Sequence, residues 1–245
     1  MCLVVVLYRV IDGAPVLIAA NREERFDRSA LPPRVFRGPP SYTCGIDQQA
    51  GGTWLGINQY GVVIAVTNRD KTGITAAPRS RGLLCLDLLS CKSARDATKR
   101  VAKDLAKGSY AGANYLCIDA EHASVIYGGR DIEVVEMQPG LHLLTNANLD
   151  DPDDRRQNLA LRLMGATPVT SVDGFMERTT KLCAHKGIVV HRSDGGTVCA
   201  DQVALTDRVE DAVYRHAPGP PDRLDFDDVS GLLHRVLAAP NPDGG

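Results

Sequence analysis

The chain has 245 residues, and its 28 Lys plus Arg nearly balance its 30 Asp plus Glu, so no overall field attracts nucleic acid or an anionic membrane. Its seven cysteines are scattered and form no C-x-x-C pair, which argues against a disulfide framework or zinc ribbon and favours a reducing, cytoplasmic compartment. The apolar run at 3–8 lacks the flanks of a signal peptide, and no membrane span is expected.

The first elements along the chain are two hairpins. Residues 1–10 and a run from Pro15 read as strands joined by a turn at Asp12-Gly13. Residues 25–40 contain so many Pro, Arg and Gly that we expect no regular structure there. TWLGIN and GVVIAVTN then form a second hairpin around Gln59-Tyr60. The sheet is therefore expected to be antiparallel at its start.

Helices and short strands follow. RGLLCLDLL and SARDATKRVAKDLAK are predicted helices, the second with Ser93 as N-cap and Gly108 as its stop. NYLCIDA, ASVIYGG, DIEVVEM and GLHLLTN read as strands, and DPDDRRQNLALRLM and SVDGFMERTTKLCAH as helices. A strand around CADQVALTD and a last helix, DDVSGLLHRVLAA, complete the chain. Roughly eight to ten strands with helices between their runs predict a layered α+β fold. We expect one domain over 1–238 and a disordered tail at 239–245.

Cys2 is the unusual residue of the first strand, because a buried strand of Val and Leu needs no thiol. One interpretation is packing, since free Cys behaves as a small hydrophobe. The other is that an aminopeptidase removes Met1. Cys2 then carries both a thiol nucleophile and an α-amine that can act as its base.

Pairing across the first hairpin determines what faces the thiol. A three-residue loop with Gly13 in the left-handed conformation pairs Cys2 with Arg22, and Glu24 then shares their face. A two-residue loop instead pairs Cys2 with Glu23, and Asn21 takes that face. With either loop, charged side chains meet the N-terminus. A guanidinium so close is expected to lower the pKa of the Cys2 thiol.

Several short motifs along residues 1–155 resemble those of one family. They are MC at 1–2, ANREE at 20–24, GGTWLGI at 51–57, VTN at 66–68, SRG at 80–82 and LTNANLDDP at 144–152. Together they resemble the NRDE family, which includes the transport-and-Golgi-organisation-two proteins. The NRDE motif itself is present as Asn21-Arg22-Glu23-Glu24, with Glu in place of Asp at its third position.

The resemblance implies an N-terminal-nucleophile hydrolase fold, a four-layer αββα sandwich with largely antiparallel sheets. The implied activity is hydrolysis or acyl transfer at an amide C–N bond of a small molecule. Cys2 would be the nucleophile, and Arg22 and Glu24 would orient and polarise its thiol. Asn68 and Asn146 would donate side-chain hydrogen bonds to the developing oxyanion, each worth about 3 to 4 kcal/mol when well placed.

Other residues of the match are assigned to substrate binding or to packing. Asn21 is expected at the substrate, and Trp54 in the core or pocket wall. The glycines around Trp54, which are Gly51, Gly52 and Gly56, are expected to allow a tight turn and close backbone packing.

The chain departs from the family near its C-terminal strand. The family tends to carry Gly-Thr-Arg-Ser there, whereas this sequence has Gly196-Thr197-Val198-Cys199, so Val198 replaces an arginine expected in the pocket. Some family members are linked to haem trafficking. The alternative function is therefore non-catalytic binding of haem or an acyl-type ligand in the same cleft. The histidines form no C-x-x-C-H motif, and we expect no metal and no cofactor other than haem as a possible ligand.

Overall fold

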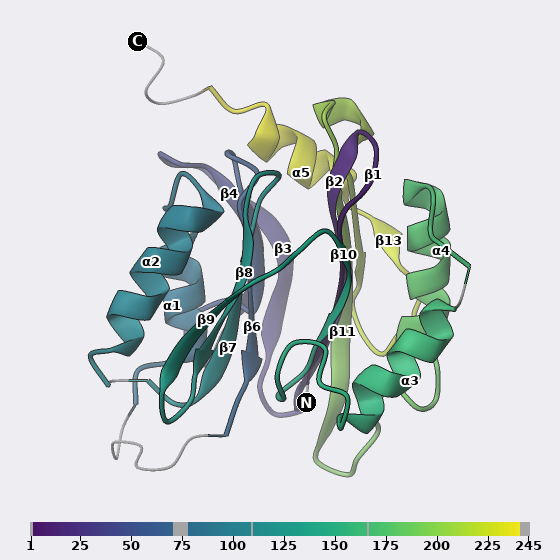
Figure 1. Cartoon of the computed structure of the whole chain (residues 1–245), viewed down its shortest axis with the longest axis horizontal. Coiled ribbons are helices and arrows are strands. Elements are labelled where there is room, and N and C mark those ends of the chain that lie inside the picture. Colours follow the sequence, from purple (N-terminus) through teal and green to yellow (C-terminus); the bar gives the residue numbers. More distant parts are fainter. Residues whose placement is uncertain (1, 71–77, 109, 166, 241–245) are drawn as a thin grey trace. The chain divides into compact units, whose positions relative to one another are not determined.

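The computed structural model describes residues 2–70, 78–108, 110–165 and 167–240. The chain divides into two compact units, each built around one antiparallel sheet (Figure 1). The first unit comprises Met1–Arg28 and Pro139–Gly231, and the second comprises Ser29–Gln138 and Leu232–Gly245. The single domain expected over 1–238 stays a prediction.

The sheet of the first unit has six strands in the order β10-β1-β2-β11-β12-β13. Their bounds are β1 Leu3–Ile11, β2 Ala14–Arg25, β10 Gly140–Leu144, β11 Gly195–Leu205, β12 Val213–Ala217 and β13 Asp227–Asp228. The unit also holds the helices α3 Arg155–Met164 and α4 Val172–Cys183 and a short 3₁₀ turn, η1 Val209–Asp211.

Alternation along β1 and β2 determines which side chains meet the helices. Leu3, Val5 and Leu17 belong to one buried cluster with Phe175 of α4 and Met164 of α3. Because successive side chains of a strand point to opposite faces, the even-numbered residues of these two strands lie on the other face. That face is also apolar and buried, as the low exposures of Val4, Val6, Val16 and Ile18 show.

The first hairpin combines the two alternatives that the sequence left open. Ile11 pairs with Ala14, so Asp12-Gly13 is a two-residue turn, and Gly13 has a φ of 73°. A bulge between Tyr8 and Ile11, where Arg9 has a φ of 51°, then shifts the register by one residue. The bulge therefore gives β1 the register that a three-residue loop would have produced.

The second unit contains a seven-stranded sheet in the order β3-β4-β5-β6-β7-β8-β9. The strands are β3 Ala30–Phe36, β4 Tyr42–Asp47, β5 Leu55–Asn58, β6 Val63–Asn68, β7 Ala113–Ile118, β8 Ala123–Gly128 and β9 Ile132–Glu136. Its helices are α1 Arg81–Leu88 and α2 Ala94–Leu105, and most of α5 Ser230–Leu237.

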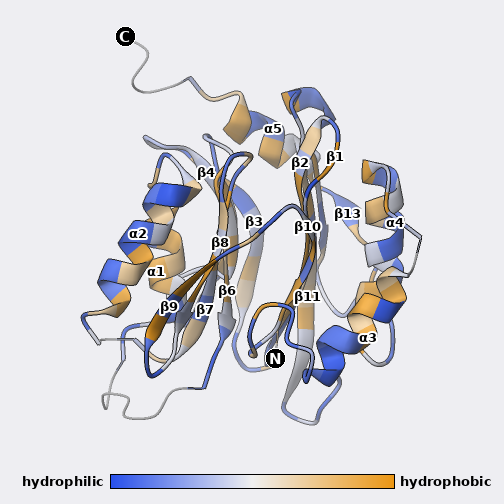
Figure 2. Cartoon of the chain, viewed as in Figure 1, coloured by the Kyte–Doolittle hydropathy of each residue, from blue (hydrophilic) through white to orange (hydrophobic). Residues whose placement is uncertain are grey.

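The amphipathic pattern of α2 explains how this sheet is covered. Ala97, Val101 and Leu105 are buried in one cluster with Tyr115 of β7 and Ile126 of β8. Figure 2 shows hydrophilic and hydrophobic stretches side by side along this helix. Ser93 caps it as predicted, because its side chain accepts a hydrogen bond from the Asp96 amide.

The secondary structure differs from the expectation in a few places. The Pro-rich stretch contains β3, which tolerates Pro32 and Pro33 because it is an edge strand with a register shift at these prolines. The sequence interpretation also missed three strands: β4, which pairs with β3 and β5, β12, which pairs with β11, and the two-residue β13. The other predicted strands and helices are present. Most of the tail, 241–245, lies outside the described residues. None of the helices described has the length and hydrophobicity needed to cross a bilayer.

Candidate active site

Cys2 lies directly before β1, between β2 and the segment that follows the end of β10. Leu3 pairs with Asn21, so the register continued by one residue sets Cys2 opposite Arg22 of β2. On the other side Val4 pairs with Leu144, so the same continuation leads to Asn146 just beyond β10. The first unit thus brings Cys2, Arg22 and Asn146 to one end of its sheet. Cys2 is half-buried there.

Asn146 keeps a polar atom without a partner. Its Oδ1 is buried and has no hydrogen-bond partner among the described residues. A buried amide oxygen without a partner is costly, and in a native structure it often marks a place where water or a ligand binds. The Asn146 side chain is therefore a suitable contact for a polar ligand atom beside Cys2.

Arg22 and Glu24 form part of a chain of charges along β2. The Arg22 side chain is 6% exposed, and its Nη2 lies 3.9 Å from Oε2 of Glu24. Arg28 approaches the same carboxylate at 3.5 Å. Arg22 also pairs with Cys199 of β11, whose pKa burial raises and the Arg22 charge lowers to a smaller extent.

Glu23 points to the helix-covered face and meets an arginine that is largely, though not fully, buried. Its Oε1 accepts a hydrogen bond of 2.7 Å from Nη2 of Arg156, near the start of α3, and one of 3.2 Å from the hydroxyl of Thr197. The same Nη2 donates to the Ile188 carbonyl at 2.7 Å. Desolvation raises the pKa of Glu23, and the positive charge of Arg156 opposes this shift.

The expected depression of the Cys2 pKa is wrong. Burial raises the pKa of the thiol above its ordinary value, and the Glu23 carboxylate raises it further. A hydrogen bond with the Glu23 main chain and the charge of Arg156 act in the opposite direction without reversing the shift. Cys2 is therefore opposite Arg22, as a three-residue loop would have placed it. The carboxylate that influences its pKa is nevertheless that of Glu23, the partner expected for a two-residue loop.

Asn21 and Val198 occupy different positions around this centre. The Asn21 side chain is buried, and its Nδ2 donates to the Cys183 carbonyl at the end of α4, 3.0 Å away. Its Oδ1 has no hydrogen-bond partner among the described residues. Val198 is the extra residue of a bulge in β11 between Thr197 and Cys199, and it is half-buried. Val198, which the resemblance sets at the position of an arginine, is thus beside the Thr197 that bonds Glu23.

A small cavity of about 170 Å³ opens beside the NREE segment. Glu23 and Glu24 line it together with Arg192 and Asp194. It is smaller than the roughly 300 to 1,000 Å³ usual for sites that enclose a drug-sized ligand. Without rearrangement it suits a small polar group.

Trp54 and Asn68 belong to the second unit, and their roles at Cys2 stay predictions. Trp54 is half-buried and packs on Gly45, where an added Cβ would lie 2.3 Å from its ring. The glycines nearby act as predicted: Gly51 has a φ of 73°, and a Cβ on Gly52 would lie 2.1 Å from the backbone of Gly82. Asn68 ends β6, where its side chain is exposed.

Sequence reasoning missed Arg156 and Thr197. Both lie more than 130 residues from Glu23, and their hydrogen bonds with it depend on tertiary packing. The signal available was DPDDRRQ, which was interpreted only as a helix start with suitable charges. Arg155 and Arg156 are adjacent in that first turn, and the sequence gives no indication of which one packs against the sheet.

Two solved structures show what kind of fold this is. A Caenorhabditis elegans orthologue of N-acylethanolamine-hydrolyzing acid amidase is similar with a TM-score of 0.56 at 10% identity, over 82% of this chain and 92% of that one. A mutant conjugated bile acid hydrolase from Clostridium perfringens is similar with a TM-score of 0.50 at 13% identity, over 94% and 93%. The chain therefore has the α+β fold of N-terminal-nucleophile hydrolases, as expected.

Sequence comparison gives the family. The model of Transport and Golgi organisation 2 matches residues 1–204, and the chain belongs to this family. The Transport and Golgi organization protein 2 homolog of Bos taurus is 34% identical over 146 residues, which cover 56% of this chain and 52% of the relative. The match thus spans about half the length of that curated relative.

Proposed function

We propose that the chain is an N-terminal-cysteine hydrolase or acyltransferase that acts on an amide bond of a small molecule. The observation that carries the proposal is the position of Cys2, with Arg22 and Asn146 on the two neighbouring strands and the Glu23–Arg156 pair next to its thiol. The fold supports it, since one structural neighbour is named as an amidase and the other as a hydrolase.

The proposed reaction begins once Met1 has been removed. The Cys2 thiol attacks the amide carbonyl carbon and passes its proton to the α-amine of the same residue. The C–N bond then breaks, and the departing amine takes that proton and leaves a thioester on Cys2. Attack by water, or by an acceptor amine in the transferase reaction, releases the acyl group and restores the thiol.

Glu23 and Arg156 are proposed to position the N-terminal amine. A carboxylate next to the amine accepts its hydrogen bond and raises its pKa, and the guanidinium limits that rise. When the α-amine accepts the thiol proton, the ammonium that forms stabilises the thiolate, because an opposite charge favours the ionised thiol. Removal of Met1 would therefore counteract the two effects that raise the Cys2 pKa.

Asn146 is proposed as an oxyanion donor. Among the described residues no hydrogen bond holds Oδ1 of Asn146, so its side-chain amide is not fixed through that atom. Its Nδ2 group can then donate a hydrogen bond to the oxygen that gains charge. Asn68 is proposed as the second donor on the family pattern alone.

The alternative is a binding protein for haem or an acyl-type ligand. Its specific support is the raised pKa of Cys2, because a thiol that stays protonated is a poor nucleophile. Three histidines are already bonded to carboxylates, in the pairs His142–Asp150, His191–Asp222 and His216–Asp201. Axial ligation of haem by one of these histidines would need its pair to open.

Trapping of the acyl-enzyme tests the proposal. The protein is incubated with N-acyl amides of increasing chain length, quenched in acid, and analysed by mass spectrometry of its N-terminal peptide. We expect an acyl adduct on Cys2 and release of the amine, both abolished in Cys2→Ala and retained in the control Cys91→Ala. Amine release that persists in Cys2→Ala would contradict the proposal, as would absence of an adduct together with saturable haemin binding in both variants.

A further inference from the structure

The second unit holds a cavity whose polar lining is largely arginine. It has a volume of about 670 Å³ and is formed by the end of β3, the residues that follow it, and α5 with its C-terminal extension. Arg34, Arg37 and Arg235 line it, and the described residues that line it include no acidic side chain. Its volume is within the usual range for sites that bind small molecules, roughly 300 to 1,000 Å³.

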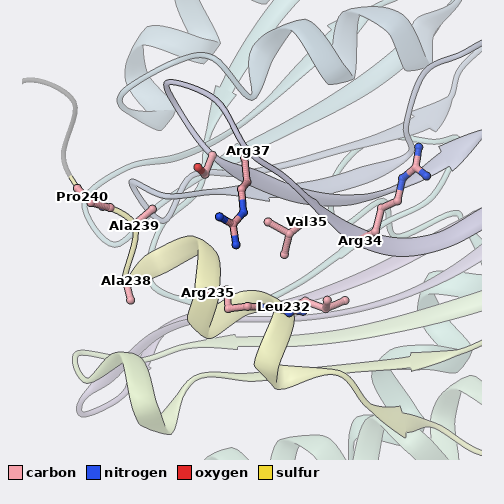
Figure 3. A pocket seen from close by; sticks show the side chains of 9 residues that line it. Arg34, Val35, Arg37, Leu232, Arg235, Ala238, Ala239 and Pro240 are labelled. Carbon is pink, nitrogen blue, oxygen red and sulfur yellow. The ribbon is translucent and has the colours of Figure 1, made fainter.

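Two of these arginines come from facing elements. Figure 3 shows Arg37 and Val35 projecting from the β3 segment towards α5, which carries Arg235 and Leu232. Figure 3 shows the Arg34 guanidinium turned away from α5. It lies 4.9 Å from the centroid of the Phe36 ring. The aliphatic part of the Arg34 side chain therefore lines the cavity. Arg37 and Arg235 contribute their positive charges to it from opposite sides.

Hydrogen bonds fix the two walls together. Gln59 accepts a bond from the Ser41 amide at 2.6 Å and donates one to the Pro240 carbonyl at 3.1 Å. The segment after α5 is thereby tied to the loop between β3 and β4. A cavity with walls held in this way is largely formed before any ligand arrives, which reduces the entropic cost of binding.

We propose that this cavity binds a phosphate ester of a small organic molecule. Guanidinium groups bind phosphate oxygens through paired, charge-assisted hydrogen bonds, and two of them match the charge of a dianion better than that of a carboxylate. Val35, Leu232 and Ala238 supply apolar wall for the carbon part of the ligand. All lining residues belong to the second unit, so the inference does not depend on the proposed chemistry at Cys2.

Isothermal titration of the full-length protein at low ionic strength tests this site with three probes: phenyl phosphate, inorganic phosphate and benzoate. We expect saturable binding of phenyl phosphate, weaker binding of inorganic phosphate, and at least tenfold weaker binding of benzoate. Benzoate that binds as tightly as phenyl phosphate would overturn the assignment to a phosphate ester, and absence of any saturable binding would overturn the site.

Variants locate the binding. Arg37→Ala and Arg235→Ala should each weaken phenyl phosphate binding tenfold or more, whereas Arg34→Ala should weaken it less. Arg95→Ala is the matched control, an exposed arginine of α2 in the same unit that does not line the cavity. Unchanged affinity in both Arg37→Ala and Arg235→Ala would overturn the proposal. These arginine side chains are exposed, so their substitution should not disturb folding, and circular dichroism of each variant checks this.

Discussion

Glu23 and Arg156 form a two-point ion pair between β2 and α3, with Nη2 2.7 Å from Oε1 and Nη1 3.3 Å from Oε2. Their side chains are only 4% and 12% exposed. Desolvation of two such charges is expensive, so the pair adds little net stability compared with an apolar packing of the same shape. Loss of one partner strongly destabilises the fold, because the other charge is left buried without a counter-charge.

Arg156→Ala should therefore destabilise the fold by about 3 to 5 kcal/mol. Arg155→Ala is the matched control, since this neighbour in the same helical turn is exposed, and it should change stability by no more than about 0.5 kcal/mol. Urea unfolding followed by circular dichroism measures both. Equal effects of the two substitutions would show that the ion pair is not a buried one.

We predict that the mature protein lacks Met1, because only a free α-amine on Cys2 can act as the proposed base. Intact mass of protein purified from its native cell should be lower than the full-sequence mass by one methionine residue. Complete retention of Met1 would remove the hydrolase proposal and leave the binding alternative.

Charge next to Cys2 should control its rate of alkylation. Arg156→Gln removes a cation that lowers the thiol pKa, so iodoacetamide labelling of Cys2 near neutral pH should slow. Glu23→Gln removes an anion that raises it, so labelling should accelerate even though turnover is lost. Peptide mass spectrometry measures the labelled fraction, with Arg155→Gln as control. Slower labelling in Glu23→Gln would contradict this account of the site.

Asp154 should make α3 sensitive to acid. Partial burial alone would raise the pKa of its carboxyl, but hydrogen bonds from Thr145 and from the amides of Gln157 and Arg156 outweigh burial and lower it. A lowered folded-state pKa contributes stability above the unfolded value, about 3.9, that is lost as the pH falls through the folded value.

Asp154 is the N-cap of α3, so Asp154→Ala should cost about 1 kcal/mol at neutral pH, the usual value of an N-cap. The difference from the wild type should shrink below about pH 4, where the carboxyl of the unfolded chain becomes protonated. Urea unfolding at neutral pH and below about pH 4 measures this difference. The control is Asp153→Ala, because Asp153 is an exposed neighbour. A cost that is the same at both pH values would show that the carboxylate charge does not contribute.

Val198→Arg should restore a cation beside the Thr197 that bonds Glu23. If the pocket is catalytic, turnover of carboxylate-bearing amides should rise roughly tenfold, which corresponds to about 1.4 kcal/mol in the barrier. If the pocket binds an apolar ligand, the same arginine should weaken binding. A substitution without effect on turnover, binding or stability would mean that residue 198 points into solvent.

Local patterns were sufficient to predict most elements, but not the site. Asp12-Gly13 marked the first turn correctly, yet nothing in Arg9 or Val10 signals a bulge, since a non-glycine residue with positive φ has no sequence mark. The register of Cys2 therefore stayed open between Arg22 and Glu23. Arg156 was beyond reach for another reason: its burial depends on how α3 packs, which local periodicity does not specify.

The bulge at Arg9 also decides where the first hairpin tolerates a change in length. Deletion of Val10 would leave Tyr8 opposite Val16, with a regular ladder down to the Asp12-Gly13 turn, so Cys2 would keep its partners. Deletion of one residue between Leu3 and Tyr8 would instead transfer the start of the chain to the opposite face of the sheet. This hairpin should therefore tolerate the gain or loss of a residue at the bulge without moving Cys2, whereas the segment between Leu3 and Tyr8 is constrained in length.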